Sequence, residues 1–221
     1  LVVCLSTVCL MVGADDGNLT QSMSIRTWLG ADTRLDLALG LVGAIVVLAL
    51  CRLAWSCGRM LDGPSATWAL VVGTLLFQLL VILALQARDT YWGDSWMVSD
   101  FVDEALVGGV TSLFRGPYRT LFYDARLYFS CYPFQATFFW LLYGLRLAFG
   151  DLAFMAFQVL SALSTSLGVW ALMSLVGSLT SSAGARRVAW VLVALCLPMY
   201  WLSTFLYGNA MGCGLALAFL A

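Results

Sequence analysis

Acidic side chains are the groups in this sequence that are best suited to chemistry. Asp94, Asp100, Asp103 and Glu104 all occur in the single segment 94–107. The sequence contains no histidine, and all of its 11 basic residues are arginine. Histidine general bases and lysine Schiff bases are therefore excluded, and any proton transfer would fall to a carboxylate.

Asp94 is the first candidate for a general base. It stands just behind an apolar run and between Trp92 and Trp96, where partial desolvation would bring its carboxyl into the working range of a base. At the start of a helix it would also cap the first turn. The pair Asp103 and Glu104 is the alternative, although both carboxylates also suit the solvated face of a helix.

Three arginines follow in the same polar stretch and are candidates for binding an anion. Arg115, Arg119 and Arg126 lie among tyrosines between residues 115 and 132. The guanidinium fork matches the oxygens of a phosphate or pyrophosphate. Ordinary loop charge is the alternative interpretation, and the sequence leaves both open.

The acidic segment must itself be positioned, and its periodicity predicts an amphipathic helix over 94–107. Apolar residues recur at helical spacing on one side, and Asp100, Asp103 and Glu104 fall on the other. Such a helix is expected to lie in a membrane interface, with its apolar stripe in lipid and its carboxylates in water. The stripe consists of Met97, Val98, Phe101, Val102, Ala105 and Leu106.

The composition predicts that an all-α, polytopic transmembrane helical bundle carries this external amphipathic helix. Of the 221 residues, 62% are hydrophobic and only 10% are charged, with a mean hydropathy of +0.93. Glutamines inside apolar runs, such as Gln78 and Gln158, are expected to face other helices. The predicted spans are 35–55, 66–87, 133–149, 152–179 and 188–205, after a shorter apolar run at 1–14.

These spans suggest two parts: amino-terminal extra transmembrane helices at 1–65 and a main module at 66–221, with a long external loop at 88–132. The chain starts at Leu1 and stops inside the apolar run 215–221, so we expect a fragment cut at both ends. The positive-inside rule places the turn at 57–65 in the cytoplasm. If successive spans cross the membrane in alternating directions, Arg186 and Arg187 lie outside, whereas the positive-inside rule would place them in the cytoplasm. Either a segment between 133 and 179 is re-entrant or partly inserted, or the two arginines are an exception.

The order of these features resembles the amino-terminal module of GT-C glycosyltransferases over residues 66–221. The resemblance rests on Asp94-Ser-Trp-Met, on Tyr128-Phe-Ser-Cys-Tyr-Pro-Phe-Gln135 and on the closing Tyr207-Gly-Asn209. The layout is similar to uncharacterised bacterial members, to protein O-mannosyltransferases and to the catalytic subunits of oligosaccharyltransferases. Ser95, Phe134 and Asn209 depart from the residues usual in those motifs.

The resemblance implies a membrane enzyme that moves a sugar from a polyprenyl phosphate to an acceptor hydroxyl at the external membrane face. Asp94 would take the place of the catalytic carboxylate, and Tyr132, Gln135, Tyr207 and Asn209 would line the substrate cavity. The acceptor would be a glycan, a lipid or a protein, and nucleic acid is not an expected partner. Direct displacement would invert the anomeric centre, and further donor-binding parts would follow in a missing carboxy-terminal region.

The expected location is a bacterial cytoplasmic membrane, with multiple passes and the active site facing outside. No cofactor is indicated, and a divalent metal lacks a supporting ligand pattern because the chain has no His and no closely spaced Cys pairs. A transporter or lipid-linked-glycan flippase is the rival function, since polar residues could line a pathway. A structural membrane subunit without an active site is the third option.

Overall fold

The structure is a computed structural model that describes residues 33–85, 94–115, 124–196, 199–200 and 208–221. The described residues are helical and contain no strand, which confirms the all-α prediction. The helices are α3 (Thr33–Cys57), α4 (Pro64–Leu85), α5 (Asp94–Gly108), α6 (Ala125–Cys131), α7 (Gln135–Phe149), α8 (Ala153–Leu179), α9 (Ala183–Ala194) and α11 (Gly208–Leu220). Short 3-10 turns are η2 (Arg59–Leu61), η3 (Val110–Phe114) and η5 (Gly150–Leu152).

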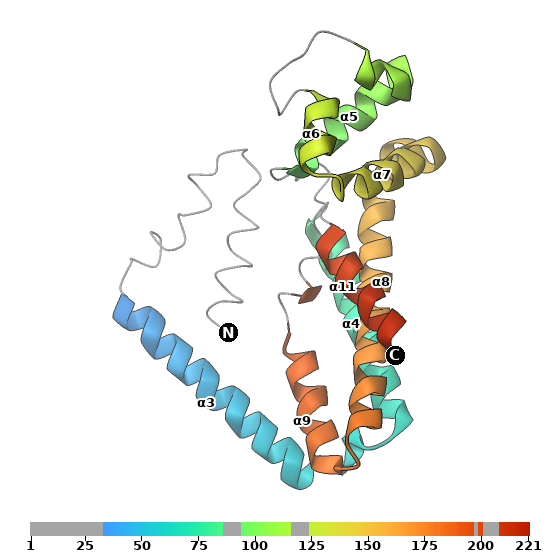
Figure 1. Ribbon diagram of the computed structural model, residues 1–221. Coiled ribbons are helices and arrows are strands. Elements are labelled where there is room, and N and C mark those ends of the chain that lie inside the picture. The colour runs from blue at the N-terminus through green and yellow to red at the C-terminus, as the bar shows by residue number, and fades with distance from the viewer. Residues whose placement is uncertain (1–32, 86–93, 116–123, 197–198, 201–207) are drawn as a thin grey trace.

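Helix α8 is the element against which most others pack. Helices α4, α9 and α11 lie along it, and α7 meets it at one end, close to α5 and α6 (Figure 1). Helix α3 meets this bundle at its carboxyl end, where it contacts α9 (Figure 1). The residues predicted as 1–65 therefore contribute a helix at the margin of the bundle, and residues 1–32 lie outside the described part.

Two glycines allow a very close approach between α8 and α11. A Cβ placed on Gly168 would come within 2.7 Å of Gly214 Cα, and a Cβ on Gly214 within 2.0 Å of the Ser164 carbonyl oxygen. Only glycine fits where two helix backbones are so close, as in the small-residue contacts of membrane helices. Any larger residue at either position would force the two helices apart.

Buried polar contacts join α4 to α8. Gln78 is fully buried and donates from Nε2 to the Thr74 carbonyl oxygen (3.1 Å) and to Ser166 Oγ on α8 (3.2 Å). The prediction that glutamines in apolar runs face other helices is confirmed for Gln78. Gln158 on α8 is also buried.

Two helical stretches are long and apolar enough to cross a membrane, Pro64–Ala84 and Gln135–Leu179. Only 28% of the most apolar stretch of Pro64–Ala84 is buried within the protein, so most of this apolar helix faces outward. An apolar helix whose side chains point outward suits lipid better than water. The described part of the chain therefore supports association with a membrane.

The predicted span at 133–149 is replaced by a helix that lies across the end of the bundle. Helix α7 begins at Gln135, and the chain turns sharply through η5, where Gly150 has a φ of +55°. Figure 1 shows α7 crosswise at the top of α8. At 15 residues, α7 extends about 22 Å, which is less than the roughly 30 Å of a bilayer core. Its apolar side is buried against the acidic segment rather than exposed beside α8.

The span predicted at 188–205 is not one unbroken helix, because α9 ends at Ala194. Leu195 forms its C-cap, and its backbone N–H donates to the Val191 carbonyl oxygen. The sequence explains the stop, since Pro198 has no N–H for the Ala194 carbonyl and would interrupt a helix there. Residues 201–207 lie outside the described part.

We predict that Gly214→Ala lowers the thermal unfolding midpoint by roughly 5 °C, because overpacking costs about 1–3 kcal/mol. Gly212→Ala is the matched control on the same helix, because nothing lies within 4 Å of a Cβ added there. This control should unfold at or slightly above the wild-type temperature, since alanine favours a helix over glycine. Thermal unfolding of the purified protein in detergent measures both, and equal midpoints for the two variants would contradict the close contact.

Candidate functional site

The acidic helix α5 lies on an aromatic and aliphatic core at one end of the bundle. Met97, Val98, Phe101, Val102 and Ala105 are buried there, as the predicted stripe requires. They pack with residues of η3, α6 and α7, among them Leu113, Tyr128, Phe139 and Leu142. The helix and its apolar stripe are confirmed.

The partner of that stripe is protein rather than lipid, which corrects the expected placement of α5. Because α7 lies across the bundle end, it offers the apolar surface that covers this side of α5. Phe101 contacts the rings of Tyr128 and Phe129 with centroids 5.6 Å away in each case. Leu106, the last residue assigned to the stripe, is exposed instead.

The opposite side of α5 carries the carboxylates. Asp100, Asp103 and Glu104 are exposed, as predicted. Asp103 Oδ1 lies 3.5 Å from Nη2 of Arg146, in the last turn of α7. Partial burial, together with the neighbouring charge of Asp103, raises the pKa of Asp100 above its ordinary value. Asp100 therefore holds its proton more readily than a free carboxyl.

Helical geometry separates the two sets of candidate bases. Asp94 is the first residue of α5, and its side chain lies outside the described part. Asp103 lies nine positions further along, which amounts to about 13 Å along the axis and two and a half turns. The backbone positions of Asp94 and Asp103 are thus on opposite sides of the helix. The two residues are alternatives for one reacting centre rather than partners in it.

Asp124 is a structural carboxylate that sequence reasoning missed, although an acid just before a helix is an N-cap signal. It is buried and forms the N-cap of α6, accepting from the backbone N–H of Arg126 at 3.0 Å. The Arg126 side chain also donates to it, from Nε to Oδ1 (3.1 Å) and from Nη2 to Oδ2 (2.9 Å). Part of the guanidinium that was expected to bind phosphate is therefore engaged by Asp124.

The remaining predicted ligands fall into two groups. Arg115 is exposed at the end of η3, and Tyr132 and Gln135 are half-buried where α6 passes into α7. Tyr132 packs against the hydrophobic core formed by α5, α6 and α7, and its carbonyl oxygen accepts from the Gln135 N–H at 3.0 Å. Arg119, Tyr207 and the side chain of Asn209 lie outside the described part. No group of three or more His, Cys, Asp or Glu in the described ranges could hold a metal ion.

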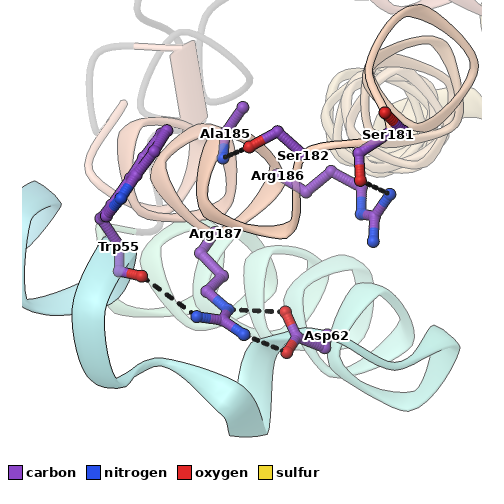
Figure 2. A network of polar contacts seen from close by, with 7 residues as sticks. All are labelled: Trp55, Asp62, Ser181, Ser182, Ala185, Arg186 and Arg187. Carbon is purple, nitrogen blue, oxygen red and sulfur yellow. Dashed lines mark hydrogen bonds and ion pairs between the residues drawn. The ribbon is translucent and has the colours of Figure 1, made fainter.

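A second polar network lies at the other end of the bundle (Figure 2). Arg187 on α9 donates from Nε to Oδ1 of Asp62 (2.6 Å) and from Nη2 to Oδ2. Its Nη1 donates to the Trp55 carbonyl oxygen (3.1 Å) at the end of α3. Sequence reasoning missed this pair because 125 positions separate its two residues.

The network places the two arginine-bearing turns side by side. The turn at 57–65 and the start of α9 are joined by the Asp62–Arg187 ion pair. Nearby, the Trp190 indole N–H donates to the Ala66 carbonyl oxygen at 2.9 Å. Helices α4 and α8 run from this end of the bundle toward the end where α5 and α7 lie, so both arginine-bearing turns lie at the same end (Figure 1).

Comparisons of this chain with protein-family models, with curated proteins and with solved structures find no match. The function must therefore be argued from the residues and their positions.

We predict that Asp124→Ala destabilises the protein by about 2 kcal/mol, because it removes an N-cap and leaves Arg126 without this carboxylate. Asp124→Asn should cost less, since an amide oxygen can still cap the helix. Asp151→Ala is the control, because Asp151 is an exposed acid in η5. Chemical denaturation of the purified protein would contradict the assignment if the Asp124→Ala and Asp151→Ala variants were equally stable.

The network of Figure 2 should weaken in acid. The hydrogen bond from Arg187 and the charges of Arg187, Arg186 and Arg59 hold the pKa of Asp62 below its ordinary value of 3.8. A lowered pKa in the folded state means that the pair stabilises above pH 3.8 and is lost as the pH falls further. Trp55 fluorescence should therefore change below pH 3.8 in the wild type. In an Asp62→Asn variant, the signal should stay constant over that range, and an identical transition would refute the assignment.

Proposed function

We propose that this chain belongs to a membrane glycosyltransferase that moves a sugar from a polyprenyl-phosphate donor to an acceptor hydroxyl. The acceptor would be a glycan, a lipid or a protein. One observation carries the proposal: a helix with exposed carboxylates is fixed at the end of an apolar helical bundle, with arginines close to it. This is the combination that a lipid-linked, anionic donor requires at a membrane surface.

The donor has a good leaving group, which limits what the protein must supply. A carboxylate accepts the proton of the acceptor hydroxyl, whose oxygen forms a bond to the anomeric carbon. The bond from that carbon to the phosphate oxygen breaks, and the electron pair leaves with the polyprenyl phosphate. Guanidinium groups stabilise the negative charge that develops there. The displacement inverts the anomeric centre.

The resemblance to GT-C enzymes and the described contacts together support a choice of residues for these roles. Asp94 is the proposed base, as the resemblance to GT-C enzymes implies, and Asp103 with Glu104 is the alternative. Asp103 is already close to Arg146, which favours a positioning role for it. Arg115 is exposed and suits the phosphate better than Arg126, whose fork is partly engaged by Asp124.

One observation favours the rival transport function. Gln78 Oε1, Ser161 Oγ and Thr165 Oγ1 are buried between helices and have no hydrogen-bond partner among the described residues. Buried polar atoms without partners are costly in an apolar interior and mark pathways in many transporters. A transporter or flippase with these residues on its pathway is therefore the second candidate.

We predict that a strain lacking the gene for this chain loses one sugar from its cell-envelope glycans. Wild type should restore the sugar, whereas Asp94→Asn should reduce it at least tenfold, because an amide cannot accept the proton. Asp151→Asn is the matched control, since it removes an exposed carboxylate outside α5. Monosaccharide analysis of the envelope, at equal membrane levels of each variant, provides the measurement.

Two further variants separate the alternatives. If Asp103→Asn/Glu104→Gln is the only variant that does not restore the sugar, the base is Asp103 or Glu104, more than two turns along α5 from Asp94. If all carboxylate variants restore the sugar while Gln78→Leu does not, the transport function is favoured. An envelope that does not change on deletion would refute the transferase proposal.

A further inference from the structure

Helix α7 has a second side, which its packing against α5 leaves uncovered. The buried stripe of α7 faces the core that it shares with α5 and consists of Phe138, Phe139, Leu142 and Leu145. The positions on the opposite side of the helix are exposed, and they are Thr137, Trp140, Gly144 and Leu147. Trp140 is 55% exposed and Leu147 is 64% exposed. A Cβ added at Gly144 would meet nothing within 4 Å, so this side of α7 is open.

This outer side of α7 carries no charge. Arg146 is the one charged residue of the helix, and it lies beside the buried stripe, where its Nη2 is 3.5 Å from Asp103 of α5. On α5, Asp100 and Glu104 are exposed and face away from the shared core. The two packed helices therefore form one amphipathic unit. Its α5 surface is acidic, and its α7 surface is uncharged and largely apolar.

The direction of α7 is that of a helix lying along a membrane surface. Helix α7 lies crosswise at the end of α8 (Figure 1), and both belong to a stretch apolar enough to cross a membrane. With 27 residues, α8 is about 40 Å long, which exceeds the roughly 30 Å of a bilayer core. A spanning α8 would therefore place its end, and α7 with it, in the headgroup layer.

The exposed apolar residues of α7 continue through the turn into α8. Phe149 and Leu152 at this turn are each more than half exposed, and Met155 and Leu163 on α8 are exposed as well. A tryptophan such as Trp140 is typical of the layer in which membrane proteins meet lipid headgroups. The lipid that would surround α8 can thus reach the outer side of α7 without a break.

We propose that α7 is embedded in the membrane interface, with Trp140 and Leu147 among the acyl chains of the nearer leaflet and α5 on the aqueous side. Helices that lie in the interface bury one apolar face in this way and keep the opposite face in water. Packed helices are about 8–10 Å apart, so α7 would hold the carboxylates of α5 one helix layer above the acyl chains. This placement does not depend on the proposed transferase function.

The test uses the full chain in nanodiscs of phosphatidylglycerol and phosphatidylcholine, with the photoreactive p-benzoylphenylalanine in place of one exposed residue. After irradiation, labels replacing Trp140 or Leu147 should gain the mass of one phospholipid, bonded at an acyl chain. A label replacing Glu104, exposed on α5, is the matched control and should capture lipid roughly tenfold less often. A label replacing Leu163 on α8 is the positive control.

Four results would overturn the proposal. The first is capture of lipid at Leu163 but not at Trp140 or Leu147, and the second is equal capture at Leu147 and Glu104. The third is a crosslinked dimer in place of the lipid adduct, which would make the outer side of α7 a contact between copies of the chain. The fourth is no capture at Leu163, because the placement of α7 relies on a spanning α8. Wild-type unfolding temperatures of the labelled variants exclude misfolding as the cause.

Discussion

The close contact between α8 and α11 sets the spacing on which the rest of the described bundle depends. In lipid, helices gain little from hiding apolar surface, so association relies on close packing and on hydrogen bonds between helices. Gly168 and Gly214 allow the close packing of α8 with α11. The hydrogen bond from Gln78 to Ser166 joins α8 to α4. With both faces of α8 occupied in this way, its end is left to support α7, and α7 in turn covers the apolar side of α5.

Local periodicity is sufficient to predict the helices but not their directions. The stripe on α5 follows from a repeat that only a helix produces, so the spacing of Val98, Phe101 and Val102 alone assigns them to a buried face. The run at 135–149 has the same pattern whether it crosses a membrane or lies across a bundle end, because composition carries no orientation. Its placement depends on the turn at Gly150 and on the apolar face of α5, which the sequence cannot bring together.

Some polar contacts follow from neighbouring residues, and others require the helices to be packed first. Asp124 caps α6 by accepting from the N–H of Arg126, two residues away, and an acid just before a helix is a recognisable N-cap signal. The contact of Asp103 with Arg146 requires α5 and α7 to be packed first, and the pair of Asp62 with Arg187 joins positions 125 apart. Sequence reasoning therefore found the exposed carboxylates of the candidate site and Arg115, but not Arg146, which contacts Asp103.

The two ends of the bundle differ in charge, and this difference constrains the orientation. Acids on α5 dominate one end, and Arg59, Arg186 and Arg187 exceed Asp62 at the other. Between Asp62 and Arg187 the chain leaves the arginine end along α4 and returns to it along α8, while α7 lies across (Figure 1). If both helices cross a membrane, the two arginine turns must share one side, and the positive-inside rule assigns that side to the cytoplasm. The carboxylates of α5 would then face outward, which is where the proposed transfer from a lipid-linked sugar would need them.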